Sequence, residues 1–216
     1  MQTLQAGLAQ VAQCPAHAAV NPAGLACRIE GLSGAGILSQ PEAMGTMLDF
    51  LLGGYLSSVF LTSTALNNLL QQPVAFTAYQ KGDAALRANA FEEMKRFDAP
   101  FQLADRYAAK DIELGGMVIP KDSLVSLAFG SANHDPAVYG STAEQFDIER
   151  VANSAQNLVF GTGEHRCIGA PMAGQAVPIV IDTLIDHCAT LRLVPGMGVR
   201  RGDPYFRGFN QLLLKR

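Results

Sequence analysis

One cysteine, Cys167, follows a glycine-rich loop and stands just before an apolar segment with the residue pattern of a helix. Gly163 and Gly169 allow positive φ angles and a close approach of the backbone to a flat partner. At the start of a helix, free backbone N–H groups and the positive end of the helix dipole stabilise a thiolate. A thiolate at Cys167 would therefore be stabilised by its position in the chain.

The residues beside Cys167 suit the same role. Phe160 adds an aromatic face to the loop, while His165 and Arg166 add groups that donate hydrogen bonds to carboxylates. Taken alone, a cysteine near a glycine-rich turn is more often an inert, buried thiol. A structural zinc ion at His165 and Cys167 would need two further ligands, which the local sequence does not supply.

From Phe160 to Gly169 the loop reads F-x-x-G-x-H-x-C-x-G, which resembles the heme-binding loop of the cytochrome P-450 family. The resemblance implies that the thiolate of Cys167 is the axial ligand of the iron in heme b. It also implies that Phe160, Gly163 and Gly169 shape the cofactor site and that His165 contacts a heme propionate.

A long apolar helix is predicted upstream of this loop. Ser39, Pro41 and Glu42 form a helix-start signal, and the helix should run to about Gln72 and stop at Pro73. Its length and its closing proline resemble the distal helix of the cytochrome P-450 family. We therefore expect this helix to cover one face of the heme.

The residues inside this helix carry the comparison further. Two adjacent glycines, Gly53 and Gly54, indicate tight helix packing by themselves, and they match the small pair of the family's distal helix. Ser57 stands where the family usually has threonine, and Leu56 stands in the place of its acid. The resemblance implies that Gly54 lies against the cofactor and that Ser57 is the catalytic hydroxyl. Leu56 cannot relay a proton.

Glu93 and Arg96 form an E-x-x-R pair on one face of another predicted helix. Most such pairs are solvated and add little to stability. Here Phe97-Asp98-Ala99-Pro100 follows, and the whole resembles the family's E-x-x-R helix and its proline-containing turn. Arg150 matches the second arginine of that family, so the resemblance implies a buried structural charge cluster of Glu93, Arg96 and Arg150.

Residues 101–125 alternate and turn like a small sheet, with Gly115 and Gly116 between two strands. Within this sheet Arg106 matches the family's arginine that contacts a heme propionate, although an ordinary surface arginine would look the same. Short strands are also expected at residues 191–193 and 206–214.

Two further predictions concern single residues. His134 lies in a turn-like run at residues 132–136, which favours a turn residue over a metal ligand. The helix after Cys167 should reach His187, with a kink or an altered path at Pro178.

Composition narrows the class of protein. Of the 216 residues, 49% are hydrophobic and 16% are charged, so the chain can bury a sizeable core. A net charge of -3 without a basic stripe argues against nucleic acid as a partner. The N-terminus lacks the pattern of a secretory signal, and we expect the most apolar window, residues 48–61, to be too short to span a bilayer. We expect a cytoplasmic protein that does not bind membranes.

The predicted fold class is mainly α with small β-sheets, the C-terminal half of a cytochrome P-450-like fold. Residues 1–38 are expected to be poorly structured, mostly loop with a weak helix at Met1–Gln13. Residues 39–216 should form a truncated heme-binding domain. Without a counterpart of the family's N-terminal half, exposed apolar surfaces should favour a homo-oligomer or a partner chain that covers them.

The predicted function is that of a heme-thiolate oxidoreductase, a monooxygenase or a peroxide-using enzyme, which oxidises a small organic molecule. A ferredoxin-type redox partner would serve the dioxygen-dependent reaction. The alternative is a non-catalytic relative, heme-binding or heme-free, that acts through a protein partner. A fragment of a broken gene is the third interpretation.

Overall fold

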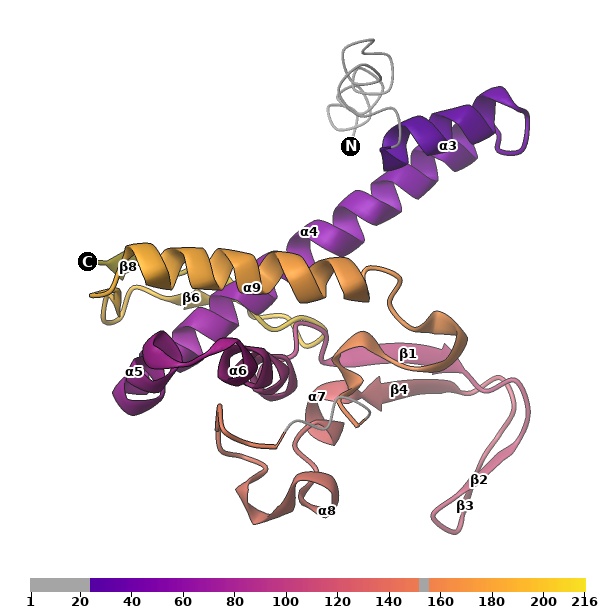
Figure 1. Ribbon diagram of the computed structural model, residues 1–216. Coiled ribbons are helices and arrows are strands. Elements are labelled where there is room, and N and C mark those ends of the chain that lie inside the picture. Colours follow the sequence, from indigo (N-terminus) through magenta and orange to yellow (C-terminus); the bar gives the residue numbers. More distant parts are fainter. Residues whose placement is uncertain (1–23, 152–155) are drawn as a thin grey trace. The chain divides into compact units, whose positions relative to one another are not determined.

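The computed structural model describes residues 24–151 and 156–216 (Figure 1). Contacts divide the chain into two compact units, one before Ser57 and one from Ser57 to Arg216, and the division falls inside one continuous helix. Among the described residues the secondary structure is mainly helical, with four two-stranded sheets. The predicted fold class is confirmed.

The helices and 3-10 turns are α3 (Leu25–Gly34), α4 (Gln40–Leu70), α5 (Pro73–Lys81), α6 (Ala84–Phe97), α7 (Phe129–Ala132), α8 (Pro136–Tyr139), η1 (Gly140–Thr142), η2 (Leu158–Phe160), η3 (Gly163–His165) and α9 (Ala170–His187). The strands are β1 (Leu103–Tyr107), β2 (Ile112–Leu114), β3 (Met117–Ile119), β4 (Leu124–Ala128), β5 (Arg192–Leu193), β6 (Val199–Arg200), β7 (Phe209–Gln211) and β8 (Leu214–Lys215).

The first unit contains α3, where we expected a loop, so that expectation is wrong between Leu25 and Gly34. Leu25, Ile29 and Leu32 recur at helical spacing, and Ile29 is buried. The helix expected at Met1–Gln13 lies outside the described residues. The division of the chain at residue 39 stays a prediction.

The start of α4 is capped as predicted. The Ser39 hydroxyl accepts the Glu42 backbone N–H at 3.4 Å, while the Ser39 backbone N–H donates to Glu42 Oε2 at 2.7 Å. This reciprocal pair is a capping box. A hydrogen bond from the Ser39 hydroxyl also lowers the pKa of the Glu42 carboxyl. At its other end α4 stops at Leu70, and Pro73 opens α5.

With 31 residues, α4 is long and apolar enough to cross a membrane, so the expectation that its apolar window is too short is wrong. Buried core helices of soluble proteins meet the same criteria. In the second unit α4 behaves as a core helix, because Phe60, Leu66 and Leu69 are buried there. Buried Asn68 also donates from Nδ2 to Asp98 Oδ2 at 2.8 Å.

Helices α4, α5, α6 and α9 share the hydrophobic core of the second unit (Figure 1). This core explains the path of α9, which runs without a break through Pro178 to His187. Proline removes one backbone donor. Val177, Ile181 and Ile185 are all buried along one face of α9 and hold the helix to the core.

Most strands lie where the sequence predicted them, but β4 extends beyond residue 125 to Ala128 and β6 at Val199–Arg200 was not predicted. β1 pairs antiparallel with β4, from Leu103 opposite Ala128 to Tyr107 opposite Leu124. β2 and β3 form a hairpin whose tip residues, Gly115 and Gly116, have φ of 58° and 77°. Such a pair of positive φ angles is typical of a type I′ turn. The C-terminal strands pair as β5 with β8 and β6 with β7.

Candidate heme site

Cys167 lies in the exposed connection between η3 and α9 and has a free thiol. Gly161 and Gly163 have φ of 65° and 70°, a conformation that favours glycine. Gly169 instead has φ of -81°, a conformation open to other residues as well. A Cβ atom on Gly169 would lie 3.7 Å from Cys167 Sγ, at van der Waals distance from the sulfur.

A backbone hydrogen bond between Cys167 and Phe160 closes the loop. The Cys167 N–H donates to the Phe160 carbonyl at 2.8 Å, and the Arg166 N–H donates to the Gly163 carbonyl at 3.1 Å. His165 and Arg166 are exposed, and so is Cys167. The structure therefore brings Phe160 and Cys167 together and leaves the thiol accessible on a fixed backbone.

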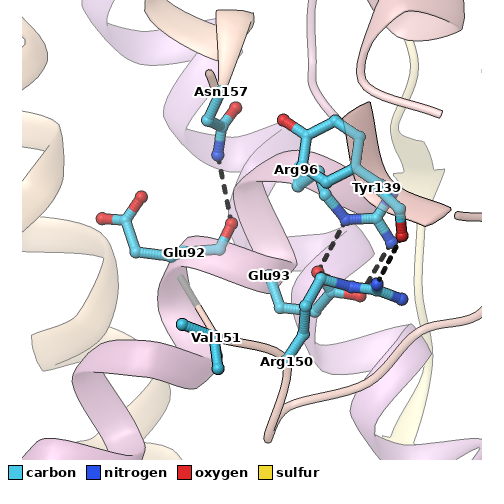
Figure 2. A pocket seen from close by; sticks show the side chains of 7 residues that line it. All are labelled: Glu92, Glu93, Arg96, Tyr139, Arg150, Val151 and Asn157. Carbon is cyan, nitrogen blue, oxygen red and sulfur yellow. Dashed lines mark hydrogen bonds and ion pairs between the residues drawn. The ribbon is translucent and has the colours of Figure 1, made fainter. Parts of the chain in front are cut away.

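The carboxylate of Glu93 binds two arginines (Figure 2). Arg96 donates from Nε to Glu93 Oε2 at 2.6 Å and from Nη2 to Oε1 at 2.8 Å, and Arg150 Nε donates to Oε2 at 3.2 Å. The side chains of Glu93 and Arg96 are only 1% and 2% exposed. Arg96 Nη1 also donates to the carbonyls of Asn133 and Ala143, both at 2.8 Å. The structure thus joins the three predicted residues, and their role in stability stays a prediction.

Two asparagines connect this charge cluster to the cysteine loop. Asn133 Oδ1 accepts the Leu158 N–H at 2.9 Å, while Asn157 Nδ2 donates to the Glu92 carbonyl at 3.2 Å (Figure 2). Asn157 Oδ1 also accepts the Val159 N–H at 3.1 Å and so caps η2. The start of the loop is therefore tied to α6. Sequence reasoning missed Asn157, although asparagine before a short apolar run is a capping signal.

A cavity of about 20 Å³ lies behind the charge cluster, and Figure 2 shows its lining side chains. It has room for one water molecule and none for an organic substrate. The Arg96 guanidinium lies 5.0 Å from the centre of the Tyr139 ring, and burial raises the pKa of the Tyr139 hydroxyl.

A second hollow, of about 700 Å³, is large enough for a small molecule. None of the residues predicted for the heme site lines it. Its lining consists of Gln102, Ala128, Gly130, Ser131, Ala132, His134, Asp135, Pro136, Glu144 and Arg207. His134 Nδ1 lies 2.8 Å from the Gly130 carbonyl oxygen, a local contact of the kind expected for a turn residue.

The remaining predicted residues lie on α4 and β1. Gly54 is half-buried in the first unit, and Ser57 is half-buried at the start of the second. Arg106 belongs to β1, and its Nη1 donates to the carbonyl of the neighbouring Asp105 at 2.8 Å. Contacts of these three residues with a cofactor stay predictions.

The donors around Cys167 suit a metal with a single protein ligand. In the part of the chain that the structure describes, no group of three or more His, Cys, Asp or Glu side chains could hold a metal ion. A porphyrin supplies the equatorial ligands of its iron and needs only an axial donor, which an exposed thiol can provide.

A mainly helical fold with an exposed cysteine between a glycine-rich loop and a helix is compatible with the class of heme-thiolate proteins. The sequence profile of cytochrome P450 matches residues 83–200, more than half of the chain. The chain belongs to the cytochrome P450 family.

Curated relatives include the biotin biosynthesis cytochrome P450 of Bacillus subtilis, 33% identical over 72% of this chain and 38% of the relative. Another is the 6-deoxyerythronolide B hydroxylase of Saccharopolyspora erythraea, 34% identical over 83% of this chain and 42% of the relative. The chain thus spans less than half of the length of these relatives.

Solved structures agree with this assignment. P450BioI in complex with a fatty-acyl-ligated acyl carrier protein superposes with a TM-score of 0.77 at 31% identity and covers 83% of this chain and 45% of that chain. CYP164A2 of Mycobacterium smegmatis superposes with a TM-score of 0.83 at 26% identity and covers 99% of this chain and 52% of that chain. The fold of this chain is therefore part of the cytochrome P450 fold.

Proposed function

We propose that the chain binds heme b through the thiolate of Cys167 and takes part in the oxidation of a small organic molecule as a heme-thiolate monooxygenase. The observation that carries the proposal is an exposed thiol on a backbone that the Phe160 carbonyl closes at 2.8 Å. When bound, heme supplies the oxygen chemistry, and a thiolate ligand favours O–O cleavage by donating electron density.

Other residues of the chain would hold and orient the cofactor. Phe160 provides an aromatic face, and the glycines at 163 and 169 keep side chains away from the flat ring. His165 and Arg106 are polar donors suited to the two propionates. The exposure of His165 supports this role, because its ring is accessible to a ligand.

On the other face, Ser57 would hold a proton or an ordered water at its Oγ, and Gly54 would leave room beside the cofactor. Leu56 has no group that exchanges protons, so only the hydroxyl remains for the proton relay. This arrangement favours peroxide, which brings both oxygen atoms and electrons, over dioxygen with a ferredoxin-type partner. Replacing Leu56 by aspartate should raise the dioxygen-dependent rate more than the peroxide-dependent rate, measured with one substrate and both oxidants.

We propose a cytoplasmic setting without nucleic acid or membrane partners, supported by the net charge of -3 and by the bacterial relatives. A homo-oligomer or a partner chain would cover apolar residues of α4. Leu52 and Tyr55 support this, because they are 61% and 66% exposed. The same exposed residues favour the second candidate function, a non-catalytic relative that acts through a protein partner.

The first test is an absorption spectrum of the purified chain with added hemin, recorded before and after reduction under carbon monoxide. Thiolate ligation predicts the strongly red-shifted Soret band of a thiolate–iron–carbon monoxide complex. Cys167→Ser should abolish this band. Cys27→Ser is the matched control, since Cys27 is a free, half-buried thiol in the first unit and should leave the band unchanged.

The outcomes separate the two candidate functions. A thiolate spectrum that depends on Cys167 supports heme binding and justifies turnover assays with peroxide and with dioxygen. A spectrum of free hemin, or one that Cys167→Ser leaves unaltered, would refute the ligand assignment. It would favour the second candidate function in its heme-free form. The next experiment would then be the identification of a protein partner.

A further inference from the structure

We infer that Lys95 is a positioning residue of the cysteine loop, because its buried ammonium group holds the aromatic ring of Phe160. The inference rests on the proposed role of Cys167 as the heme ligand. It adds a residue that lies outside the charge cluster of Glu93, Arg96 and Arg150.

The burial of Lys95 is the first observation. Lysine is rarely buried unless its charge is paired. The side chain of Lys95 is only 8% exposed, and its ammonium pairs with Glu92 Oε1 one turn earlier on α6. The second carboxylate oxygen of Glu92 has no hydrogen-bond partner among the described residues. A solvated surface pair would leave both groups in water, so this pair has a different environment.

Aromatic rings provide that environment. Lys95 Nζ lies 5.0 Å from the centre of the Phe91 ring and 5.4 Å from the centre of the Phe160 ring. Both distances fall within the range of cation–π attraction, which is stronger for a desolvated ammonium. Phe91 belongs to α6 itself, but Phe160 ends η2 and opens the cysteine loop. Lys95 therefore joins α6 to the loop by an attraction between charge and ring.

From Phe160 the contact reaches the ligand in one step. The carbonyl of Phe160 accepts the backbone N–H of Cys167 at 2.8 Å. A Phe160 ring that is held in one position restrains the Phe160 backbone. Through the hydrogen bond to its carbonyl, that backbone then restrains the position of Cys167. Asn157 holds the other end of η2 through the Glu92 carbonyl. The two contacts restrain both the position and the tilt of the loop.

The test measures the loop without the cofactor. Lys95→Met keeps the length of the side chain and removes its charge. In the metal-free protein, hydrogen exchange of the Cys167 amide should accelerate by roughly three- to thirtyfold, the factor equivalent to losing a cation–π contact. Lys95→Arg should restore slow exchange. Lys81→Met is the matched control, since Lys81 is an exposed lysine at the end of α5 and should change nothing.

A double-mutant cycle identifies the ring as the partner. Phe160→Leu should accelerate the same amide, and adding Lys95→Met to it should give no further change. A second double variant, Glu92→Gln with Lys95→Met, removes the carboxylate that Lys95→Met alone would leave unpaired. It should exchange as fast as Lys95→Met alone.

Three results would overturn the inference. These are unchanged exchange in Lys95→Met, additive effects with Phe160→Leu, or slow exchange restored in the Glu92→Gln, Lys95→Met double variant. With hemin present, Lys95→Met should also shift the midpoint potential of the iron, whereas Lys81→Met should not. If no variant, including the original protein, binds hemin, the proposed function fails, and the exchange data still decide the role of Lys95.

Discussion

The cysteine loop and the Gly53–Ser57 segment of α4, which we propose for the two faces of a heme, differ in how much of their surroundings this chain supplies. Behind the loop, Glu93 and Arg96 are almost completely buried, and hydrogen bonds connect α6 to η2. In the α4 segment Tyr55 is 66% exposed. The chain therefore contains buried groups that support the cysteine loop, whereas the α4 segment presents side chains to solvent. Perturbations of the two regions should differ in kind.

The largest expected effect follows from removing the centre of the charge cluster. Glu93→Ala leaves the buried Arg96 without a countercharge, which should lower the free energy of unfolding by about 3–5 kcal/mol. Urea unfolding followed by circular dichroism measures it. Glu113→Ala, on the exposed strand β2, is the control. A loss below about 1 kcal/mol for Glu93→Ala would assign the support of the loop to other residues.

A smaller loss is expected where α4 enters the core. A Cβ atom at Gly208 would lie 2.3 Å from the ring of Phe60, which is 2% exposed. Gly208→Ala should therefore destabilise the protein by about 1–3 kcal/mol through overpacking. Gly202→Ala, with no heavy atom within 4 Å of the added Cβ, is the control. If Gly208→Ala were as stable as Gly202→Ala, the packing around Phe60 would be loose enough to accept the added Cβ atom. The contrast with the exposed Tyr55 would then not hold.

The exposed segment itself should tolerate change. Tyr55→Ser should alter the free energy of unfolding by no more than about 0.5 kcal/mol, because the side chain is mostly in solvent. If α4 mediates the predicted self-association, sedimentation should show a smaller species for Tyr55→Ser than for the original chain. A large loss of stability in dilute, monomeric protein would contradict the contrast between the two regions.

The smallest expected effect is on the loss of stability at acid pH, through a carboxyl group on α9, the helix that follows the loop. Arg87 Nη2 donates to Asp186 Oδ1 at 2.9 Å, and this hydrogen bond lowers the pKa of the Asp186 carboxyl. The stabilisation is present above the unfolded-state pKa of about 3.9 and is lost as the pH falls through the lower folded-state pKa. Unfolding curves between about pH 6 and pH 3 should therefore be less acid-sensitive in Asp186→Asn than in the original chain. Identical pH profiles would contradict this.

Much of the architecture followed from the sequence, because its signals are local. Ser39 with Glu42 marked the start of α4, Pro73 marked its end, and the glycine pair at 115 and 116 marked a hairpin. These residues act on the backbone within a few positions, so neighbouring letters are enough to identify them.

The charge cluster needed more than local spacing, since an E-x-x-R pair is usually solvated. The family resemblance supplied Arg150, and the structure then placed it 3.2 Å from Glu93. The role of Lys95 could not be predicted from the sequence for the same reason. Its partner Glu92 is three residues away on α6, so the pair looks like any surface pair until Phe91 and Phe160 are seen around it.

Local signals are less informative where tertiary packing overrides local propensity. Pro178 predicted a kink or an altered path; α9 continues through Pro178 with buried residues on one face, and a kink there stays a prediction. The run from Leu25 to Gly34 looked like a loop because its glycines hid the helical spacing of its apolar residues.

The exposed thiol of Cys167 can also be used to measure how many molecules have a sulfur that is not bound to iron. Cys167 is exposed, whereas Cys27 and Cys188 are half-buried. An alkylating reagent should modify Cys167 before those two as long as its sulfur is not coordinated, because an iron–sulfur bond occupies the electron pair that attacks the reagent. Mass spectrometry measures the alkylated fraction of the peptide that contains Cys167. This fraction would then equal the fraction of molecules whose Cys167 sulfur is not bound to iron, at any stage of purification or turnover.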